Sequence, residues 1–145
     1  MATVKDILDR KGYDVVTIAA DDSVFTAAKL MNARKIGGVI VLEDQEVIGI
    51  FTERDVLRRV VAERRDPAKT LIRDVMTAPV TTCRPGATLE ECQALLTDKR
   101  IRHLPVLDDD GLRGIITSGD LLAHHVSEQA ATIEYLNNYM FDIRS

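Results

Sequence analysis

The chain contains an internal repeat that spans most of its length. Residues 49–55 (GIFTERD) return as residues 114–120 (GIITSGD), and the Gly, Thr and Asp of both segments are related by one offset of 65 residues. The same offset relates three upstream pairs, Ser23 with Thr88, Ile36 with Ile101 and Val41 with Val106. A recurring hydroxyl and carboxylate indicate one supersecondary unit that was duplicated with its polar end retained. Two such ends predict two related pockets.

Composition predicts a small globular protein. At 145 residues and 46% hydrophobic content, the chain can bury one hydrophobic core or two small cores that pack against each other. Aromatic residues make up 4% and Trp is absent, so packing must rest on aliphatic side chains. No apolar run approaches the roughly 18 residues that span a bilayer, and the first residues lack a signal-peptide pattern. We therefore expect a cytoplasmic protein without a membrane partner.

Charge and cysteine content exclude two further classes. A net charge of −4 and a pI near 5.4 argue against a nucleic-acid partner, which requires a basic surface. Cys83 and Cys92 have neither CxxC spacing nor a second pair nearby, so we expect reduced packing residues and no metal site.

Each half predicts the same order of elements. In the first half these are a lead-in helix at residues 4–8, an extended run at 15–18, a helix capped within 21–23, strands at 39–42 and 47–51, and a helix capped by Thr52 that reaches about residue 61. In the second half they are a lead-in at 72–76, an extended run at 81–83, a helix with a capping-box signature at Thr88 and Glu91, and strands at 104–107 and 112–116.

The fold expected from this order is α/β (α+β), with two βαββα repeats packed as a pseudo-twofold pair and a C-terminal helix. Residues 127–140 have no copy in the first half, and Ile133, Leu136 and Met140 form an apolar stripe typical of an amphipathic helix. We predict a first repeat at 1–62, a linker at 63–71, a second repeat at 72–126 and the terminal helix at 127–145.

The repeated motif places polar groups at the start of a helix that follows a strand. Thr52 with Asp55, and Thr117 with Asp120, lie where backbone N–H groups and the positive end of the helix dipole attract phosphate. A carboxylate one turn into the helix can accept hydrogen bonds from ribose hydroxyls. Helix capping alone is the simpler interpretation of a single copy. The duplication favours a binding role.

Two βαββα repeats that each end in Gly-apolar-apolar-Thr-x-x-Asp, with residues 102–106 (RHLPV) before the last hairpin, resemble a cystathionine-β-synthase (CBS) domain pair. The resemblance covers about residues 4–125 and is strongest to stand-alone bacterial CBS proteins and their plant organellar relatives. It implies a non-catalytic regulator that binds adenine nucleotides in clefts between the repeats. AMP is the first choice of ligand, with NAD or ATP as alternatives.

The resemblance also implies the roles of individual residues. Asp55 and Asp120 would hold ribose, and Thr52 and Thr117 would hold the first phosphate. The adenine would lie against the backbone of residues 80–82 in one cleft and 16–18 in the other, under Ile101 or Ile36. The implied ligand-binding residues are Thr17, Ile18, Ile36, Gly37, Gly38, Thr52, Arg54, Asp55, Val80, Thr81, Thr82, Arg100, Ile101, Arg102, His103, Leu104, Pro105, Thr117 and Asp120.

The two repeats differ in the residues that could hold an anion. Gly37 and Gly38 stand where the second repeat has Arg102 and His103, so we expect the clefts to be unequal, with phosphate binding favoured where Arg102 and His103 lie. In the other direction, Arg54 corresponds to a glycine in the second repeat.

Other functions find less support. Residues 124–125 (HH) are adjacent and therefore point about 100° apart on a helix, which favours a solvated helix end over a metal site. No nucleophile–base pair supports catalysis. We expect a homodimer that signals to an unidentified protein target. The alternative is a ligand-free module for protein interaction and dimerisation.

Overall fold

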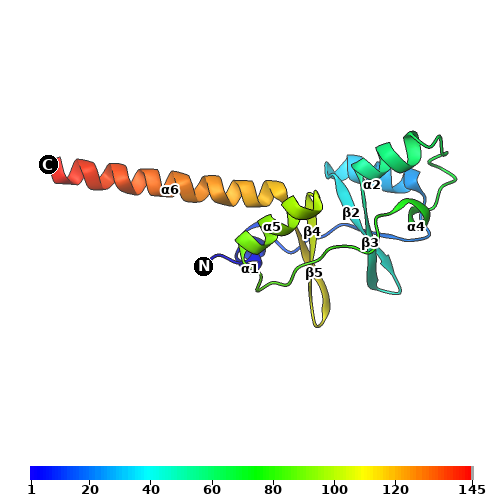
Figure 1. The fold of residues 1–145 in the computed structure, drawn as a ribbon, viewed down its shortest axis with the longest axis horizontal. Helices are drawn as coiled ribbons and strands as arrows, with labels where there is room; N and C mark the ends of the chain where they lie inside the picture. The colour runs from blue at the N-terminus through cyan, green and yellow to red at the C-terminus, as the bar shows by residue number, and fades with distance from the viewer. Residues whose placement is uncertain (145) are drawn as a thin grey trace.

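The computed structural model describes residues 1–144 as two lobes, from which one long helix extends (Figure 1). The elements are α1 (Val4–Lys11), β1 (Thr17–Ala19), α2 (Val24–Arg34), β2 (Gly38–Glu43), β3 (Glu46–Thr52), α3 (Glu53–Asp55), the π-helix η1 (Val56–Val61), α4 (Ile72–Val75), α5 (Leu89–Lys99), β4 (His103–Asp108), β5 (Gly111–Thr117) and α6 (Ser118–Arg144). The mixed α/β fold with two small sheets and a C-terminal helix confirms the predicted fold class.

The first sheet has the strand order β1-β2-β3. β1 runs parallel to β2, with Thr17 opposite Ile40, and β2 pairs antiparallel with β3. Asp44 and Gln45 connect the hairpin with φ angles of 51° and 67°, as the right-handed twist of a two-residue hairpin requires. The second hairpin, β4-β5, shares the register irregularity of the first, which lies after Val41 in one repeat and after Val106 in the other.

The second sheet lacks the expected first strand. Residues 81–83 make only an isolated parallel bridge, between Cys83 and Val106. In the first repeat, the Ile40 N–H donates to the Val16 carbonyl over 3.1 Å. Pro105 occupies the position equivalent to Ile40 and has no N–H, so the ladder cannot extend to Thr81.

α2 and α5 begin and end at positions that the repeat makes equivalent. The Ser23 hydroxyl accepts from the Thr26 N–H over 3.1 Å, and the Thr88 hydroxyl accepts from the Glu91 N–H over 3.2 Å. Lys35 and Arg100 end these helices in the left-handed conformation, with φ of 56° and 55°.

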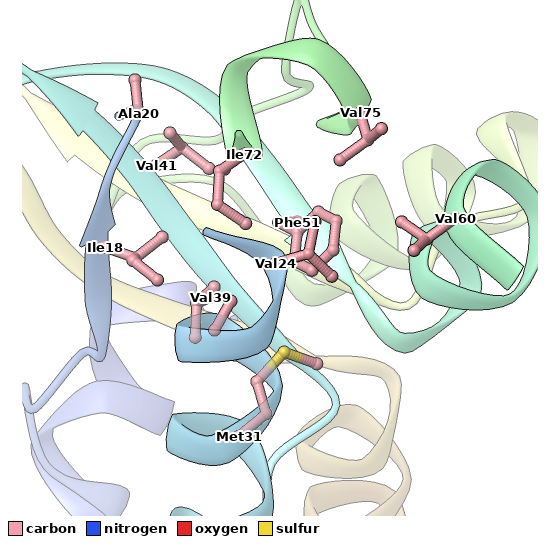
Figure 2. Close-up of a cluster of buried hydrophobic side chains, with 11 residues drawn as sticks. Ile18, Ala20, Val24, Met31, Val39, Val41, Phe51, Val60, Ile72 and Val75 are labelled. Carbon is pink, nitrogen blue, oxygen red and sulfur yellow. The ribbon is translucent and has the colours of Figure 1, made fainter. Parts of the chain in front are cut away.

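The lead-in helices exchange between the lobes. Figure 1 shows α1 beside α5, and its buried Leu8 packs in the core of the second repeat. Ile72 and Val75 of α4 pack in the core of the first repeat, which Figure 2 shows. The order of elements predicts that each lead-in belongs to the repeat that follows it, but in the structure each lead-in packs in the core of the other repeat.

Two equivalent glycines permit this exchange. A Cβ at Gly49 would lie 2.8 Å from both the Met76 sulfur and the Thr77 carbonyl oxygen. A Cβ at Gly114 would lie 3.0 Å from Leu8. The lead-in of the other repeat therefore requires a glycine in β3, whereas a side chain in β5 would require the Leu8 side chain to shift.

The C-terminal helix differs from its expected bounds. α6 is one helix of 27 residues, and no break separates a segment beginning at residue 127 from the second repeat. His124 and His125 consequently lie inside the helix and not at a solvated end. The His124 ring contacts the Arg10 guanidinium and lies 3.1 Å from the Glu128 carboxylate. No described helix could span a membrane.

Candidate functional site

The first polar corner lies where β3 meets α3. Asp55 is 5% exposed, and one of its carboxylate oxygens accepts from the Thr52 N–H over 3.0 Å. The other accepts from the Thr77 hydroxyl over 3.0 Å. The Asp55 N–H donates to the Thr52 hydroxyl over 3.4 Å, so the corner is a complete capping box. A buried carboxylate with these partners is held rigidly.

The second polar corner, at the start of α6, has a closer cation than the first, where the Arg59 guanidinium lies 3.7 Å from the Asp55 carboxylate. The Thr117 N–H donates to the Asp120 carboxylate over 2.9 Å, and the Asp120 N–H donates to the Thr117 hydroxyl over 3.1 Å. Lys11, at the end of α1, donates to the same Asp120 carboxylate over 2.7 Å and to the Ile115 carbonyl over 2.9 Å. Any other donor to this carboxylate therefore has to compete with the Lys11 ammonium group.

Two cavities lie between the repeats, and each takes its polar corner from one repeat and its other wall from the other. The Thr52 cleft has a volume of about 340 Å³, and the Thr117 cleft has a volume of about 500 Å³. Both lie in the range of ligand pockets. The predicted residues that line the Thr52 cleft are Gly37, Thr52, Arg54, Asp55, Val80, Thr81, Ile101, Arg102 and His103. Those that line the Thr117 cleft are Ile36, Gly37, Gly38, Arg102, His103 and Thr117.

Seven predicted residues line neither cavity. They are Thr17, Ile18, Thr82, Arg100, Leu104, Pro105 and Asp120. Leu104 is fully buried in the core of the second repeat, and Ile18 belongs to the core of the first. Arg100 contributes through its backbone, because its carbonyl accepts from the Arg54 guanidinium over 2.8 Å. Asp120 accepts a hydrogen bond from Lys11, which itself lines the Thr117 cleft.

Sequence reasoning missed several lining residues. In the Thr52 cleft these are Ile50, Glu53, Leu57, Arg58, Thr77 and Pro79, and in the Thr117 cleft Lys11, Asp14, Val15, Lys35, Glu53, Ile115 and Ser118. Two signals pointed to some of them. Lys35 is related to Arg100 by the repeat offset of 65. The lead-ins are offset by 68, so the first half has about three additional residues, and Lys11 lies near them.

Arg102 and His103 line both cavities. The His103 ring lies 3.4 Å from where a Cβ on Gly38 would stand, and 3.7 Å from that on Gly37. The turns before β2 and β4 therefore meet at the boundary of the repeats. Arg102 and His103 cannot alone make the clefts unequal, contrary to the argument from sequence.

The two clefts differ in one backbone carbonyl that the repeat makes equivalent. Among the hydrogen bonds of residues 1–144, none ends at the Thr81 carbonyl, because Pro105 has no N–H to offer it. The equivalent Val16 carbonyl is already bonded to Ile40. A free, half-buried carbonyl is available to a donor on a ligand.

The Thr52 cleft is also cationic. Arg54, Arg58 and Arg102 oppose the carboxylates of Glu53 and Asp55, and within the described residues no ion pair engages Arg58 or Arg102. Burial lowers the pKa of His103 below its ordinary value; Arg102, Lys11 and Arg54 act in the same direction and Glu53 opposes them. His103 is therefore neutral near pH 7. The arrangement offers hydroxyl, amide and guanidinium donors to an anion beside an apolar wall.

Comparison with known proteins agrees with this geometry. The CBS domain family model matches residues 4–62 and 72–127. A mitochondrial CBS domain-containing protein of Arabidopsis thaliana, CBSX3, is 33% identical over 95% of this chain and 71% of its own length. A putative signal-transduction protein with CBS domains from Burkholderia ambifaria is 40% identical with a TM-score of 0.85, covering 88% of this chain and 96% of that one. A hexameric CBS-CP12 protein from bloom-forming cyanobacteria is 32% identical with a TM-score of 0.74, over 83% of this chain and 70% of that one.

The chain belongs to the CBS domain family and contains a pair of CBS repeats. CBS pairs are generally regulatory modules that bind adenosine-containing ligands, and stand-alone CBS proteins are regulatory and not catalytic. Family membership thus confirms the predicted resemblance and the assignment as a non-enzyme. The expectation of a cytoplasmic location stays a prediction.

Proposed function

We propose that this protein is a regulatory sensor that binds one adenine nucleotide, with AMP as the first candidate and NAD or ATP as alternatives, in the Thr52 cleft. The observation that carries the proposal is the convergence of a free backbone carbonyl, a capped helix start and unpaired guanidinium groups in one cavity. These are the groups that a base, a ribose and a phosphate need.

Each part of the nucleotide has a counterpart in this cleft. The adenine amino group donates to the Thr81 carbonyl, and Ile101 covers the face of the base. The ribose lies at the Thr52–Asp55 corner, where the rigid carboxylate accepts from its hydroxyls. The phosphate lies toward Arg102 and Arg58. Of the α3 N–H groups only that of Arg54 contributes, because those of Glu53 and Asp55 donate to Gly37 and Thr52.

The Thr117 cleft is the weaker site in this proposal. Lys11 neutralises Asp120 at 2.7 Å, so ribose must compete with an ion pair for the carboxylate. The Val16 carbonyl is already used by the first sheet. The inequality of the clefts therefore comes from Lys11 and Pro105.

Binding between the repeats provides a mechanism for regulation. A ligand that contacts both repeats stabilises the relative orientation of the repeats in which these contacts are made. A protein target that binds only this orientation then responds to the ligand. Exposed Leu57 and Val61 on η1 and Leu122 on α6 provide apolar surface for a homodimer. The alternative is a ligand-free interaction module, which requires only this surface.

Equilibrium dialysis against AMP, ATP, NAD and adenosine tests the proposal. We expect AMP uptake, and we expect Arg102→Ala to weaken AMP binding about tenfold or more while adenosine binding hardly changes, since a charge-assisted contact contributes about 1.5–3 kcal/mol. Arg65→Ala is the matched control, because it removes the same charge outside both clefts. Absence of uptake of every adenine compound would favour the interaction module.

A further inference from the structure

The exposed face of α6 carries a regular apolar stripe, which we name the α6 seam. Its large side chains are half to two-thirds exposed, and one polar residue interrupts them. The seam consists of Leu122 (64% exposed), Val126 (53%), Gln129, Ile133 (59%), Leu136 (50%) and Met140 (54%). Within the described residues nothing covers this face, and Figure 1 shows α6 extending away from both lobes. A helix of 27 residues is about 40 Å long.

The spacing of the seam is that of a coiled coil. Successive seam residues are four and three positions apart in strict alternation, which gives the period of 3.5 that keeps a stripe facing a partner helix. Val126 and Ile133 then occupy a positions, and Leu122 and Leu136 occupy d positions. β-branched residues at a with Leu at d favour two parallel strands.

The flanks of the seam suit an identical partner. The e and g positions carry no Asp, Glu, Lys or Arg; they are Ala123, Ala130 and Asn137 on one side and His125, Thr132 and Tyr139 on the other. Glu128 and Glu134 lie at c and b positions, away from the seam. A second copy of α6 in register therefore meets no like charge, and its Gln129 meets the same amide, which can both donate and accept.

A lipid surface fits this helix less well. Helices that lie on membranes carry Lys or Arg on their polar face. Residues 118–140 contain neither. The uncharged flanks and the choice of a and d residues point to a helix partner.

We propose that α6 pairs with the α6 of a second copy as a parallel, two-stranded coiled coil along residues 122–140. This inference rests on the homodimer of the proposed function and specifies how its two chains are joined. Because α6 begins directly after Thr117, the coiled coil connects the Thr117 corners of the two copies through a continuous helix. A change in repeat orientation in one chain is thereby transmitted to its partner.

Sedimentation equilibrium of two charge insertions tests the pairing. Ile133→Lys places a cation in the seam, and Ala131→Lys places the same cation at an f position on the opposite face. We expect Ile133→Lys to raise the dimer dissociation constant at least tenfold and Ala131→Lys to leave it unchanged. Equal dissociation constants for Ile133→Lys and the wild type overturn the coiled coil.

Cysteine cross-linking tests the parallel register. Under oxidised glutathione, Gln129→Cys and Leu136→Cys should each form a covalent dimer, because every seam position faces itself in a parallel pair. Asn138→Cys, at an f position, is the control and should stay uncross-linked, and the native Cys83 and Cys92 are buried. Cross-linking at only one seam position, or at neither, overturns the parallel arrangement. AMP uptake by these variants reports separately on the proposed function.

Discussion

Pro105 and Lys11 are the residues that most distinguish the two clefts. Both are plain in the sequence, but their effects depend on pairing. In the first repeat, the Ile40 N–H donates to the Val16 carbonyl. The equivalent residue in the second repeat is Pro105, which has no N–H, so the Thr81 carbonyl receives no such hydrogen bond. The ammonium group of Lys11 matters because α1 packs on the second repeat and brings it 2.7 Å from Asp120. The sequence motif alone could identify Thr52 and Asp55 as site residues. It could not predict the free Thr81 carbonyl or the contact of Lys11 with Asp120.

His103 gives the residue-scale prediction. Its pKa is lowered in the folded protein, so the unfolded chain binds the proton more readily. The stability from neutral His103 is fully present above its unfolded pKa of about 6.5 and is lost as pH falls through the lower folded pKa. We expect the free energy of unfolding to fall more steeply below pH 6.5 in the wild type than in His103→Gln. Urea denaturation measures this free energy at each pH. If it fell equally steeply with pH in both proteins, His103 would not be the source of the pH dependence. The negative charge of a bound phosphate should reduce the difference.

At the scale of elements, the repeat offset predicted more than the order of helices and strands. It located both hairpins, a helix cap within residues 21–23 and the cap at Thr88, because local chemistry determines these features. The exchange of α1 and α4 was not predictable, since an amphipathic helix has the same pattern whichever core it covers. The continuity of α6 follows from the lack of Gly or Pro between residues 120 and 144.

The exchanged lead-in helix gives the element-scale prediction. Leu8 is fully buried among residues of the second repeat, so Leu8→Ala should cost about 2–5 kcal/mol of unfolding free energy. Hydrogen exchange should accelerate first in α5 and β4. Leu30→Ala is the matched comparison, because Leu30 packs on the core of the first repeat and should perturb β1 and β2. Perturbation by Leu8→Ala confined to residues 17–61 would show that α1 does not complete the second core.

At the scale of the molecule, two lobes face each other across two clefts that occupy equivalent places in the repeats but differ in their polar groups. The Thr52 cleft combines a rigid capped corner, a free carbonyl and three guanidinium groups. Beside the Thr117 cleft, the Asp120 carboxylate is paired with Lys11. A sensor with one strong site per chain, joined to a second copy through α6, accounts for these differences together.

Calorimetric titration of the intact protein with AMP tests this account most directly. We expect one strong AMP site per chain, located in the Thr52 cleft, and much weaker binding in the Thr117 cleft. Lys11→Ala should strengthen binding in the Thr117 cleft, because it frees the Asp120 carboxylate. Two equal sites per chain in the wild type would contradict the assigned asymmetry. A titration without binding would contradict the account as a whole.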